Sequence, residues 1–552
     1  MVLMSQRMHS LARGVQRIYY SPVFCYILIA SGLILRLRHY LENRSLWLDE
    51  AYVALQVTST TWREIFFFIP LIADVPQSPP FFYAVQKLSA DIGGPSELAL
   101  RFFPCLCGCA ALFLFYAFLK RFARPEVVGM ALALFALNPR LIYYSAEVKT
   151  YSFDLIISMG LLIFISWVHR HGYRPRHILW LGLVCGWVMW ASYASMFLTA
   201  SFGLWLTWIS LKERNHKRFG FLFLIFLFWL LNFLALYRLS FQTMVGDEAL
   251  LHMWPNGLLL HPFFSWQALV WLKQAVLNVF RNPLAVEWVY FSAAVFLAGG
   301  VALCRRRPRY FYWLVLPILL VLAASVARKY PFQGRMLLFL MPGMVLILAE
   351  GVLTIAALFK RKSAFMVFVL AGALLWHPAI RAGRHFINGY FHEDNRQVMQ
   401  YLRSHYQTGD LISLTSQGFF PYLYYAYQLR FFEILPVWPD EIGEEKLFAY
   451  PFLGRFDESF FEDDSGRYLD FVFVLPFINN QGQFRQMLMQ KNFLSFDEKS
   501  VWQDDFPQRV WIVFMHEPPQ PIKKFILDLL GRSGPRQQAL EAQGASVYLY
   551  RL

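Results

Sequence analysis

Residues 178–211 read ILWLGLVCGWVMWASYASMFLTASFGLWLTWISL, an apolar run of 34 residues without an Asp, Glu, Lys or Arg. As one helix this run would be roughly 51 Å long at 1.5 Å per residue, whereas the core of a bilayer is roughly 30 Å thick. The run is therefore predicted to form two membrane-spanning helices joined by a turn near residues 192–195. Such a run is typical of a multi-pass α-helical membrane protein.

The composition of the 552-residue chain supports the same class. Hydrophobic residues make up 57% of the chain and charged residues only 16%, with 55 Phe, 28 Tyr and 18 Trp. A water-soluble core does not absorb that much apolar surface. The formal net charge is +15, but the basic residues fall in short clusters between apolar runs. That placement is the orientation signal of a membrane protein, so nucleic acid is not an expected partner.

Eleven segments are apolar and long enough to be predicted as membrane-spanning helices. They are residues 22–39, 97–119, 127–144, 152–168, 178–194, 195–211, 219–237, 284–303, 310–327, 336–358 and 364–380. With eleven spans, every cluster of Lys and Arg falls on one side, which the positive-inside rule assigns to the cytoplasm. Residues 79–92 would break this agreement as a further span. Their Lys87 and Asp91 favour a helix that lies at the membrane interface instead.

This topology predicts a multi-pass protein of the plasma (inner) membrane with a cytoplasmic N-terminus. We expect a transmembrane domain over residues 1–380, with a second interfacial helix around Ile65–Ile69. Its outer loops would be residues 40–96, 145–151, 238–283 and 328–335. Residues 381–552 are richer in charge and are expected to form a small α/β domain outside the cytoplasm. Its expected elements are helices at 393–406 and 419–428 and strands at 411–414, 471–475, 510–515 and 546–550.

Two adjacent carboxylates, Asp49 and Glu50, follow the first span. Acidic residues near helix ends are common, so their position alone does not show a function. The topology, however, places three further polar and aromatic segments on the same outer surface: residues 77–83, 144–151 and 329–335. Their common sidedness suggests that the four segments contribute to one site.

These segments together resemble the membrane-embedded (GT-C) glycosyltransferases that use polyprenyl phosphate, the protein-mannosyltransferase and aminoarabinose-transferase superfamily. The resemblance covers the layout of about residues 20–360. It rests on the Asp49–Glu50 pair, the Pro79–Pro80 entry to an interfacial helix, the Gly-x-Ser-Glu-x-x-x-Arg run that ends at Arg101, and the Glu-x-Lys-x-Tyr turn at residues 147–151. It implies a donor sugar on a lipid phosphate that is transferred with inversion outside the cytoplasm.

An inverting transfer to a hydroxyl needs a base near the acceptor. Asp49 matches the aspartate of the family's acidic pair and is our candidate base, and Glu50 would orient the site. If the acceptor is already an anion, Asp49 would position it instead. The leaving phosphate needs cationic stabilisation, for which the candidates are Arg335, Lys149, Lys329 and Arg101. Arg335 is favoured because arginine binds phosphate through two hydrogen bonds, although the residues of the 328–335 turn could equally anchor lipid headgroups.

Glu147 matches the second outer-loop acid of the superfamily. It could coordinate a divalent cation together with Asp49, or it could pair only with Lys149. The aminoarabinose transferases place an acidic and a basic residue directly before the Pro-Pro, where this chain has Gln77–Ser78. This departure leaves the dependence on a metal ion open.

Aromatic and histidine side chains of the outer loops are the remaining candidates. Tyr52, Tyr83, Tyr144 and Tyr151 could stack on a sugar or line the lipid groove, or they could form an interfacial aromatic belt. His252 and His261 could bind the substrate by contacting the acceptor, could contact a metal ion, or could make structural hydrogen bonds. Asp247–Glu248 is a further candidate for acceptor binding.

The leading hypothesis is a glycosyltransferase that moves a sugar from a polyprenyl-phosphate carrier to an extracytoplasmic acceptor, whether lipid, polysaccharide or protein. The alternatives are a lipid-linked sugar flippase or transporter, and a scaffold that acts through its tail. Transporters place ionisable residues near the middle of the bilayer, whereas the acids and bases here lie at the outer ends of spans. That difference favours the enzyme.

Overall fold

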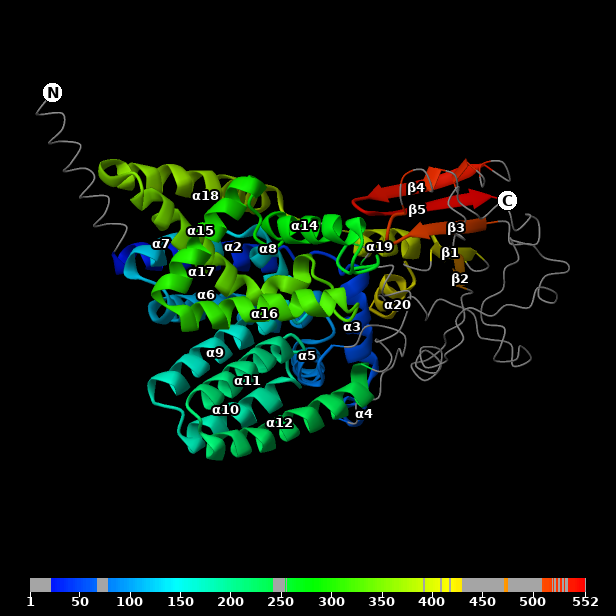
Figure 1. The fold of residues 1–552 in the computed structure, drawn as a ribbon. Helices are drawn as coiled ribbons and strands as arrows, with labels where there is room; N and C mark the ends of the chain where they lie inside the picture. The colour runs from blue at the N-terminus through cyan, green and yellow to red at the C-terminus, as the bar shows by residue number, and fades with distance from the viewer. Residues whose placement is uncertain are drawn as a thin grey trace, which may run out of the picture. The chain divides into compact units, whose positions relative to one another are not determined.

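The computed structural model describes residues 21–66, 78–241, 254, 256–390, 393–407, 410–415, 418–428, 471–474, 509–518, 520, 523–524, 527–528, 531 and 535–551 (Figure 1). The chain divides into two compact units. Unit 1 comprises Met1–Glu42, Pro76–Val85 and Arg101–Gly389, and unit 2 comprises Asn43–Val75, Gln86–Leu100 and Tyr390–Leu552. Unit 2 therefore combines the tail with two segments of the first outer loop. The expected domain boundary at residues 380/381 stays a prediction.

Helices are the regular elements of unit 1 in its described part. Its elements are α2 (Pro22–Leu41), α6 (Glu97–Phe122, from Arg101 onward), α7 (Pro125–Ala136), α8 (Pro139–Tyr143), η1 (Tyr144–Ala146), α9 (Tyr151–Arg170), α10 (Pro175–Val188), α11 (Ser195–Lys212), α12 (His216–Leu236), η2 (Tyr237–Phe241), α14 (Trp266–Arg281), α15 (Val289–Arg306), α16 (Pro308–Val326), η3 (Gly334–Leu340), α17 (Met341–Ala357), η4 (Lys360–Lys362) and α18 (Ser363–Asn388). Helices α9 to α12 run alongside one another (Figure 1).

Within the described residues, eight helices are long and apolar enough to cross a membrane, or nine if the bent pair Pro125–Ala136 and Pro139–Ala146 is one span. The eight are α2, α6, α9, α12 with η2, α15, α16, η3 with α17, and α18. This finding confirms the multi-pass helical fold. Helix α10 has only 14 residues, fewer than the about 20 that a span needs, so the total of eleven spans stays a prediction.

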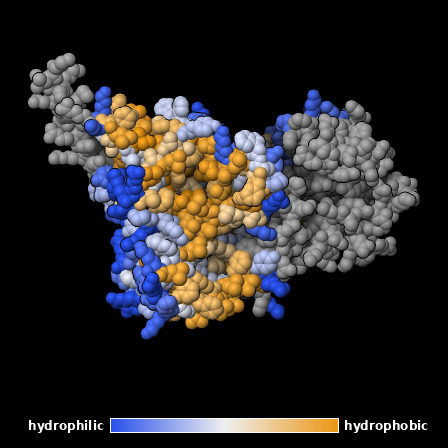
Figure 2. Space-filling view, in the orientation of Figure 1, coloured by the Kyte–Doolittle hydropathy of each residue, from blue (hydrophilic) through white to orange (hydrophobic). Residues whose placement is uncertain are grey.

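The surface of unit 1 is that of a membrane protein. Figure 2 shows a broad hydrophobic face with hydrophilic residues gathered toward one end. Helix α12 alone exposes Phe223, Leu224, Leu227, Leu230 and Leu231. Water-soluble monomers rarely expose apolar patches of this extent, so this face is suited to contact with lipid tails.

The expected turn between the two helices of residues 178–211 is confirmed. Helix α10 ends at Val188 and α11 begins at Ser195. The Ser195 hydroxyl donates a hydrogen bond of 2.6 Å to the carbonyl of Ser192, which closes the turn locally.

The span expected over residues 127–144 is a bent pair of helices, because the segment bends by 54° between α7 and α8. Pro139 lacks the N–H that a continuing helix requires, and it disfavours helical backbone at Asn138. The Asn138 side chain instead caps α8, accepting from the amides of Arg140 at 2.9 Å and Leu141 at 3.0 Å. The break turns the chain toward Glu147, which follows η1 in extended conformation.

Unit 2 contains the elements predicted for the tail together with helices from the first outer loop. Those helices are α3 (Leu48–Ser59), α4 (Trp62–Phe66) and the second half of α5 (Pro80–Gly93), and the tail adds α19 (Asn395–His405), α20 (Phe419–Gln428), β1 (Leu411–Thr415), β2 (Phe471–Val474), β3 (Arg509–Phe514), β4 (Arg536–Ala542) and β5 (Ala545–Arg551). Helix α5 confirms that residues 79–92 are helical, and their place at the membrane interface stays a prediction. Helix α3 was not expected.

The strands form one mixed sheet in the order β2-β1-β3-β5-β4. Strand β1 pairs in parallel with β3, with Ile412 opposite Trp511, and the other pairs are antiparallel. Strand β3 is buried from Val510 to Phe514 and forms the centre of the core of unit 2. Strand β4 lies at the edge and is mostly exposed.

Candidate active site

Asp49 and Glu50 lie in the first turn of α3, directly after the extended residue Trp47. The helix begins with the amides of Glu50 and Ala51, which donate to the Trp47 carbonyl at 3.0 and 2.9 Å. Carboxylates are favoured in this turn because the helix dipole is positive at its N-terminus. Glu50 is fully buried and Asp49 is half-buried. Of the two, Asp49 is therefore the carboxylate that a substrate can reach.

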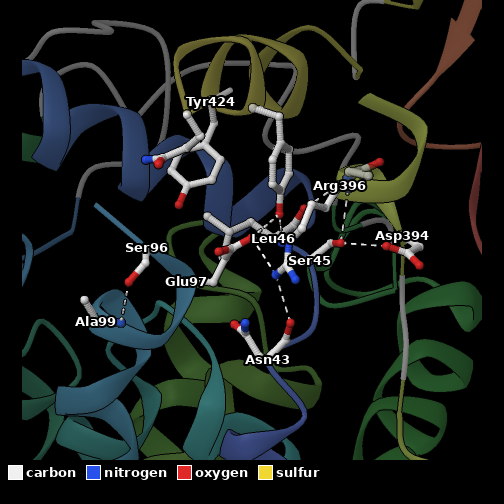
Figure 3. Close-up of polar contacts among 12 residues, drawn as sticks. Asn43, Ser45, Leu46, Ser96, Glu97, Ala99, Asp394, Arg396 and Tyr424 are labelled. Carbon is white, nitrogen blue, oxygen red and sulfur yellow. Dashed lines mark hydrogen bonds and ion pairs between the residues drawn. The ribbon is translucent and has the colours of Figure 1, made fainter. Parts of the chain in front are cut away.

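The chain just before α3 is held by the tail of the protein (Figure 3). The hydroxyl oxygen of Tyr425 in α20 accepts a hydrogen bond from the Leu46 amide at 2.7 Å. Asn395 at the start of α19 donates from Nδ2 to the Leu46 carbonyl at 3.0 Å, and the Ser45 hydroxyl donates to Asp394 at 2.9 Å. Both polar groups of the Leu46 backbone are thus satisfied by side chains from the tail, which fixes the approach to Asp49.

A charged pair reinforces this attachment. Arg396 of α19 donates to Oε1 of Glu97 from Nε at 2.9 Å and from Nη2 at 2.7 Å, and its Nη2 also donates to the Asn43 carbonyl at 2.8 Å (Figure 3). The Tyr425 hydroxyl donates to the same Glu97 oxygen at 2.9 Å. The glutamate of the Gly-x-Ser-Glu motif is therefore a structural residue of unit 2.

Tyr52 lies one turn after Asp49 on α3. Its ring contacts that of Phe420 in α20, with centroids 4.2 Å apart. Burial raises the pKa of Tyr52 well above its ordinary value, and the Asp49 carboxylate adds to the rise. The Tyr52 hydroxyl is therefore neutral and lies within electrostatic range of Asp49. Its role in substrate binding stays a prediction.

A second carboxylate of unit 2 holds a histidine. The Nδ1 atom of His516, just after β3, lies 2.6 Å from Oε1 of Glu393, whose side chain is only 2% exposed. The hydrogen bond to Glu393 raises the pKa of His516, burial opposes the rise, and the charges of Glu393 and Asp49 add to it. The sequence alone does not reveal this pair, because its members lie far apart in the chain and neither stands in a motif.

Glu147 is fully buried in unit 1 at the turn between η1 and α9. Its carbonyl accepts from the amide of Lys149 at 2.7 Å. The rings of Tyr144 and Tyr151 pack edge to face across this turn, 5.0 Å apart, and the Ser152 hydroxyl donates to the Tyr144 carbonyl at 2.9 Å. The turn is thus a rigid mount for the acid, while Lys149 and Tyr151 remain half-buried.

The basic turn at residues 328–335 is hydrogen-bonded to the middle of the long outer loop 238–283. The Phe332 amide donates to the Gly257 carbonyl at 2.7 Å. Arg335 is half-buried, with its guanidinium 5.2 Å from the centre of the Trp254 ring. Arg328 instead donates to the carbonyls of Leu259 at 2.8 Å and Leu260 at 2.9 Å. Arg335 is therefore oriented by an aromatic face, and a planar guanidinium is of the type that binds anions.

The other predicted residues differ in accessibility. Arg101 is 1% exposed, whereas Lys329 and His261 are exposed. The Tyr83 hydroxyl accepts from the Ser78 amide at 3.1 Å, so it organises the Pro-Pro entry to α5. His252 and Asp247–Glu248 lie outside the described residues. The substrate-binding roles of Tyr83, His252 and His261 and the phosphate-binding roles of Arg101 and Lys329 stay predictions.

The divalent cation also stays a prediction. Over the described part of the chain, no group of three or more His, Cys, Asp and Glu side chains is placed to hold a metal ion. Asp49 belongs to unit 2 and Glu147 to unit 1, so the structure does not test whether they share a cation.

Comparisons with known proteins add the following findings. ArnT from Cupriavidus metallidurans, solved in the apo state and bound to undecaprenyl phosphate, is similar with TM-scores of 0.49 and 0.48 at 11% identity; the match covers 95% of this chain and 97% of ArnT. The oligosaccharyltransferase AglB from Archaeoglobus fulgidus, in complex with an inhibitory peptide and a dolichol-phosphate, is similar with a TM-score of 0.46 at 13% identity.

That match covers 78% of this chain but only 61% of AglB, so the chain spans about three fifths of the archaeal protein. No curated protein matches the chain. Residues 77–237 match the family described as dolichyl-phosphate-mannose-protein mannosyltransferase, which over this segment confirms the resemblance predicted from the order of the sequence motifs.

Proposed function

We propose that the protein is a glycosyltransferase that moves a sugar from a polyprenyl phosphate to an acceptor outside the cytoplasm, with inversion at the anomeric carbon. The observation that carries this proposal is the mounting of Asp49. Its carboxylate is half-buried at the start of a helix whose preceding residues are held by side chains of the tail. The match of residues 77–237 to the mannosyltransferase family supports the same reaction.

The proposed reaction has one transfer step. The acceptor hydroxyl oxygen attacks the anomeric carbon while its proton passes to Asp49, and the bond from that carbon to the phosphate oxygen breaks. The polyprenyl phosphate leaves with the bonding electrons as an anion. A positioned base contributes about 10²–10⁴-fold to such a step. If the acceptor is already an anion, Asp49 positions it and takes up no proton.

The negative charge of the leaving phosphate needs cations to stabilise it, and we assign this role to Arg335 and Lys149. Arg335 is oriented by the Trp254 ring, and Lys149 is half-buried beside the rigid Glu147 turn. Fixed cations stabilise the charge that develops on the leaving oxygen without having to reorient. Glu147 is proposed to orient this turn, and with a divalent cation it would also supply an oxygen ligand.

The proposed orientation has the N-terminus in the cytoplasm and the tail outside. It rests on the positions of the Lys and Arg clusters, which the positive-inside rule assigns to the cytoplasmic ends of spans. The charged candidates Asp49, Glu147 and Arg335 would then all face the outer surface.

The test uses the purified full-length protein in lipid nanodiscs with a panel of polyprenyl-phosphate sugars, with and without a chelator. Release of free polyprenyl phosphate together with a glycosylated product supports the proposal. Movement of intact sugar lipid across a liposome membrane without release would favour the flippase instead. Neither release nor product with any donor of the panel would contradict the proposed function. If the chelator abolishes turnover and added Mg²⁺ or Mn²⁺ restores it, the reaction requires a divalent cation.

A further inference from the structure

In the Glu393–His516 pair, the carboxylate orients the imidazole as in histidines that bind a ligand through the second ring nitrogen. Glu393 is buried and accepts from two side chains: His516 through Nδ1 at 2.6 Å, and Asn395 through Nδ2 at 3.1 Å. The His516 side chain is 30% exposed. A carboxylate that accepts from Nδ1–H fixes the orientation of the imidazole and directs Nε2 away from itself.

The second ring nitrogen of His516 is available. Among the described residues, Nε2 of His516 has no hydrogen-bond partner, and it is not a buried atom. A histidine with a purely structural role usually has both ring nitrogens satisfied or packed, because unsatisfied polar groups are costly in a protein interior. Here one nitrogen is fixed to a buried acid, and the side chain that carries the other is partly exposed.

Asn395 connects the Glu393–His516 pair by hydrogen bonds to the segment that precedes the candidate base, Asp49. Asn395 donates from the same Nδ2 to Glu393 and to the Leu46 carbonyl at 3.0 Å, and Leu46 lies three residues before Asp49. The charge of Asp49 contributes to the raised pKa of His516, so the two side chains lie within electrostatic range in unit 2. Two carboxylates therefore favour an imidazolium at this position.

We propose that His516, held by Glu393, is a substrate-binding residue beside Asp49 that donates a hydrogen bond from Nε2–H to an anionic phosphate oxygen. The inference rests on the proposed function and extends it to the tail, from which sequence analysis named no site residue. A charge-assisted hydrogen bond from an imidazolium suits a phosphate better than a neutral hydroxyl. The phosphate could belong to the polyprenyl donor or to a phosphorylated acceptor, and the experiment separates these two sources.

Binding is measured on the full-length protein in nanodiscs with two probes, polyprenyl phosphate and phosphatidic acid, a phosphomonoester on a different lipid. His516→Gln should weaken binding of one of the two by about 10-fold, the effect of one hydrogen bond to a charged group. His516→Arg should recover most of the loss because it restores a cationic donor. His405→Gln, which removes another imidazole of the same unit, should bind both probes like the wild type.

Weaker binding of polyprenyl phosphate assigns His516 to the donor phosphate, and weaker binding of phosphatidic acid alone assigns it to the acceptor. Unchanged binding of both probes by His516→Gln would overturn the inference, as would an equal loss in His516→Arg, which indicates a structural role. The proposed function is judged separately by sugar release from the wild type. A wild type that releases sugar while His516→Gln binds normally would contradict this inference alone.

Discussion

Arg396 and Glu97, which lie 299 residues apart in the chain, form an ion pair in which both Nε and Nη2 of the arginine donate to Oε1 of the glutamate, at 2.9 and 2.7 Å. Arg396 also donates to the Asn43 carbonyl. We expect Arg396→Ala to destabilise unit 2 by about 2 kcal/mol, because hydrogen bonds to a partly buried charge are lost and Glu97 keeps, among the described residues, only its hydrogen bond from Tyr425.

The loss would be measured as a fall in the thermal midpoint of the purified protein, together with faster proteolysis after residue 42. The matched control is Arg403→Ala, an exposed arginine of the same helix α19, which should change stability by less than about 0.5 kcal/mol. Equal stability of the two variants would show that the pair does not hold the segment before Asp49.

Gly299 and Gly300, two adjacent glycines of α15, provide a second prediction. A Cβ at Gly299 would collide with the carbonyl oxygen of Ile347 on α17, whereas one at Gly300 would find its nearest atom at 3.6 Å, in the Phe311 ring. Gly299→Ala should therefore cost about 2 kcal/mol through forced separation of the helices. Gly300→Ala should be neutral or stabilising, since alanine is the better helix former. Thermal midpoints of the two variants in the same detergent check the contrast, and similar values would contradict the close packing of α15 on α17.

Two arginines of the basic turn are expected to affect different properties, one the binding of the donor and the other the stability of the protein. Arg335 faces the Trp254 ring, while Arg328 is engaged with the carbonyls of Leu259 and Leu260. Arg335→Ala should raise the KM for the polyprenyl-phosphate donor by about 10-fold with little change in the thermal midpoint, because a phosphate ligand is lost. Arg328→Ala should lower the thermal midpoint and leave the donor KM unchanged. Donor kinetics that respond to Arg328 rather than Arg335 would move the phosphate site.

The Glu393–His516 pair predicts a pH dependence of stability. The pKa of His516 is raised above its ordinary value of 6.5 by its bond to Glu393. Protonation of His516 therefore stabilises the folded state. This stabilisation is fully present below pH 6.5 and is lost as pH rises through the raised pKa of His516 in the folded state. The thermal midpoint of the wild type should exceed that of His516→Gln at acidic pH, and the gap should close at alkaline pH. A gap that is constant across this range would show that the titration of His516 is not linked to folding.

Much of the fold could be predicted from the sequence because it depends on local pattern. Apolar run length identified the helices that are long and apolar enough to cross a membrane, and alternation identified β1, β2, β3 and β5. Strand β4 was missed because its sequence, Arg-Gln-Gln-Ala-Leu-Glu-Ala, lies at a solvated edge and has no apolar face. Helix α14 was missed although Ala268, Trp271 and Ala275 are buried at helical spacing. Pro139 is a local signal for the bend that precedes it. The prediction of a single span over residues 127–144 relied on the length of the apolar run instead.

The candidate site was less predictable from the sequence. Asp49 and Glu147 could be selected because each stands in a short motif at the end of a span. The roles of Glu97, Arg396, Tyr425 and the Glu393–His516 pair depend on contacts between segments more than 100 residues apart. No periodicity or spacing in one sequence reports such contacts, so they emerge only from the fold.

The central claim is that Asp49 drives transfer of a sugar from a polyprenyl phosphate. The most direct measurement is the rate of polyprenyl phosphate release by the wild type and by Asp49→Asn, with the same donor and acceptor and after equal folding of both proteins is shown by thermal midpoint. Asp91→Asn, which changes another carboxylate of unit 2 that is paired with Lys87, serves as the control. We expect a loss of about 10²–10⁴-fold for Asp49→Asn alone. Wild-type turnover by a folded Asp49→Asn protein would contradict the account.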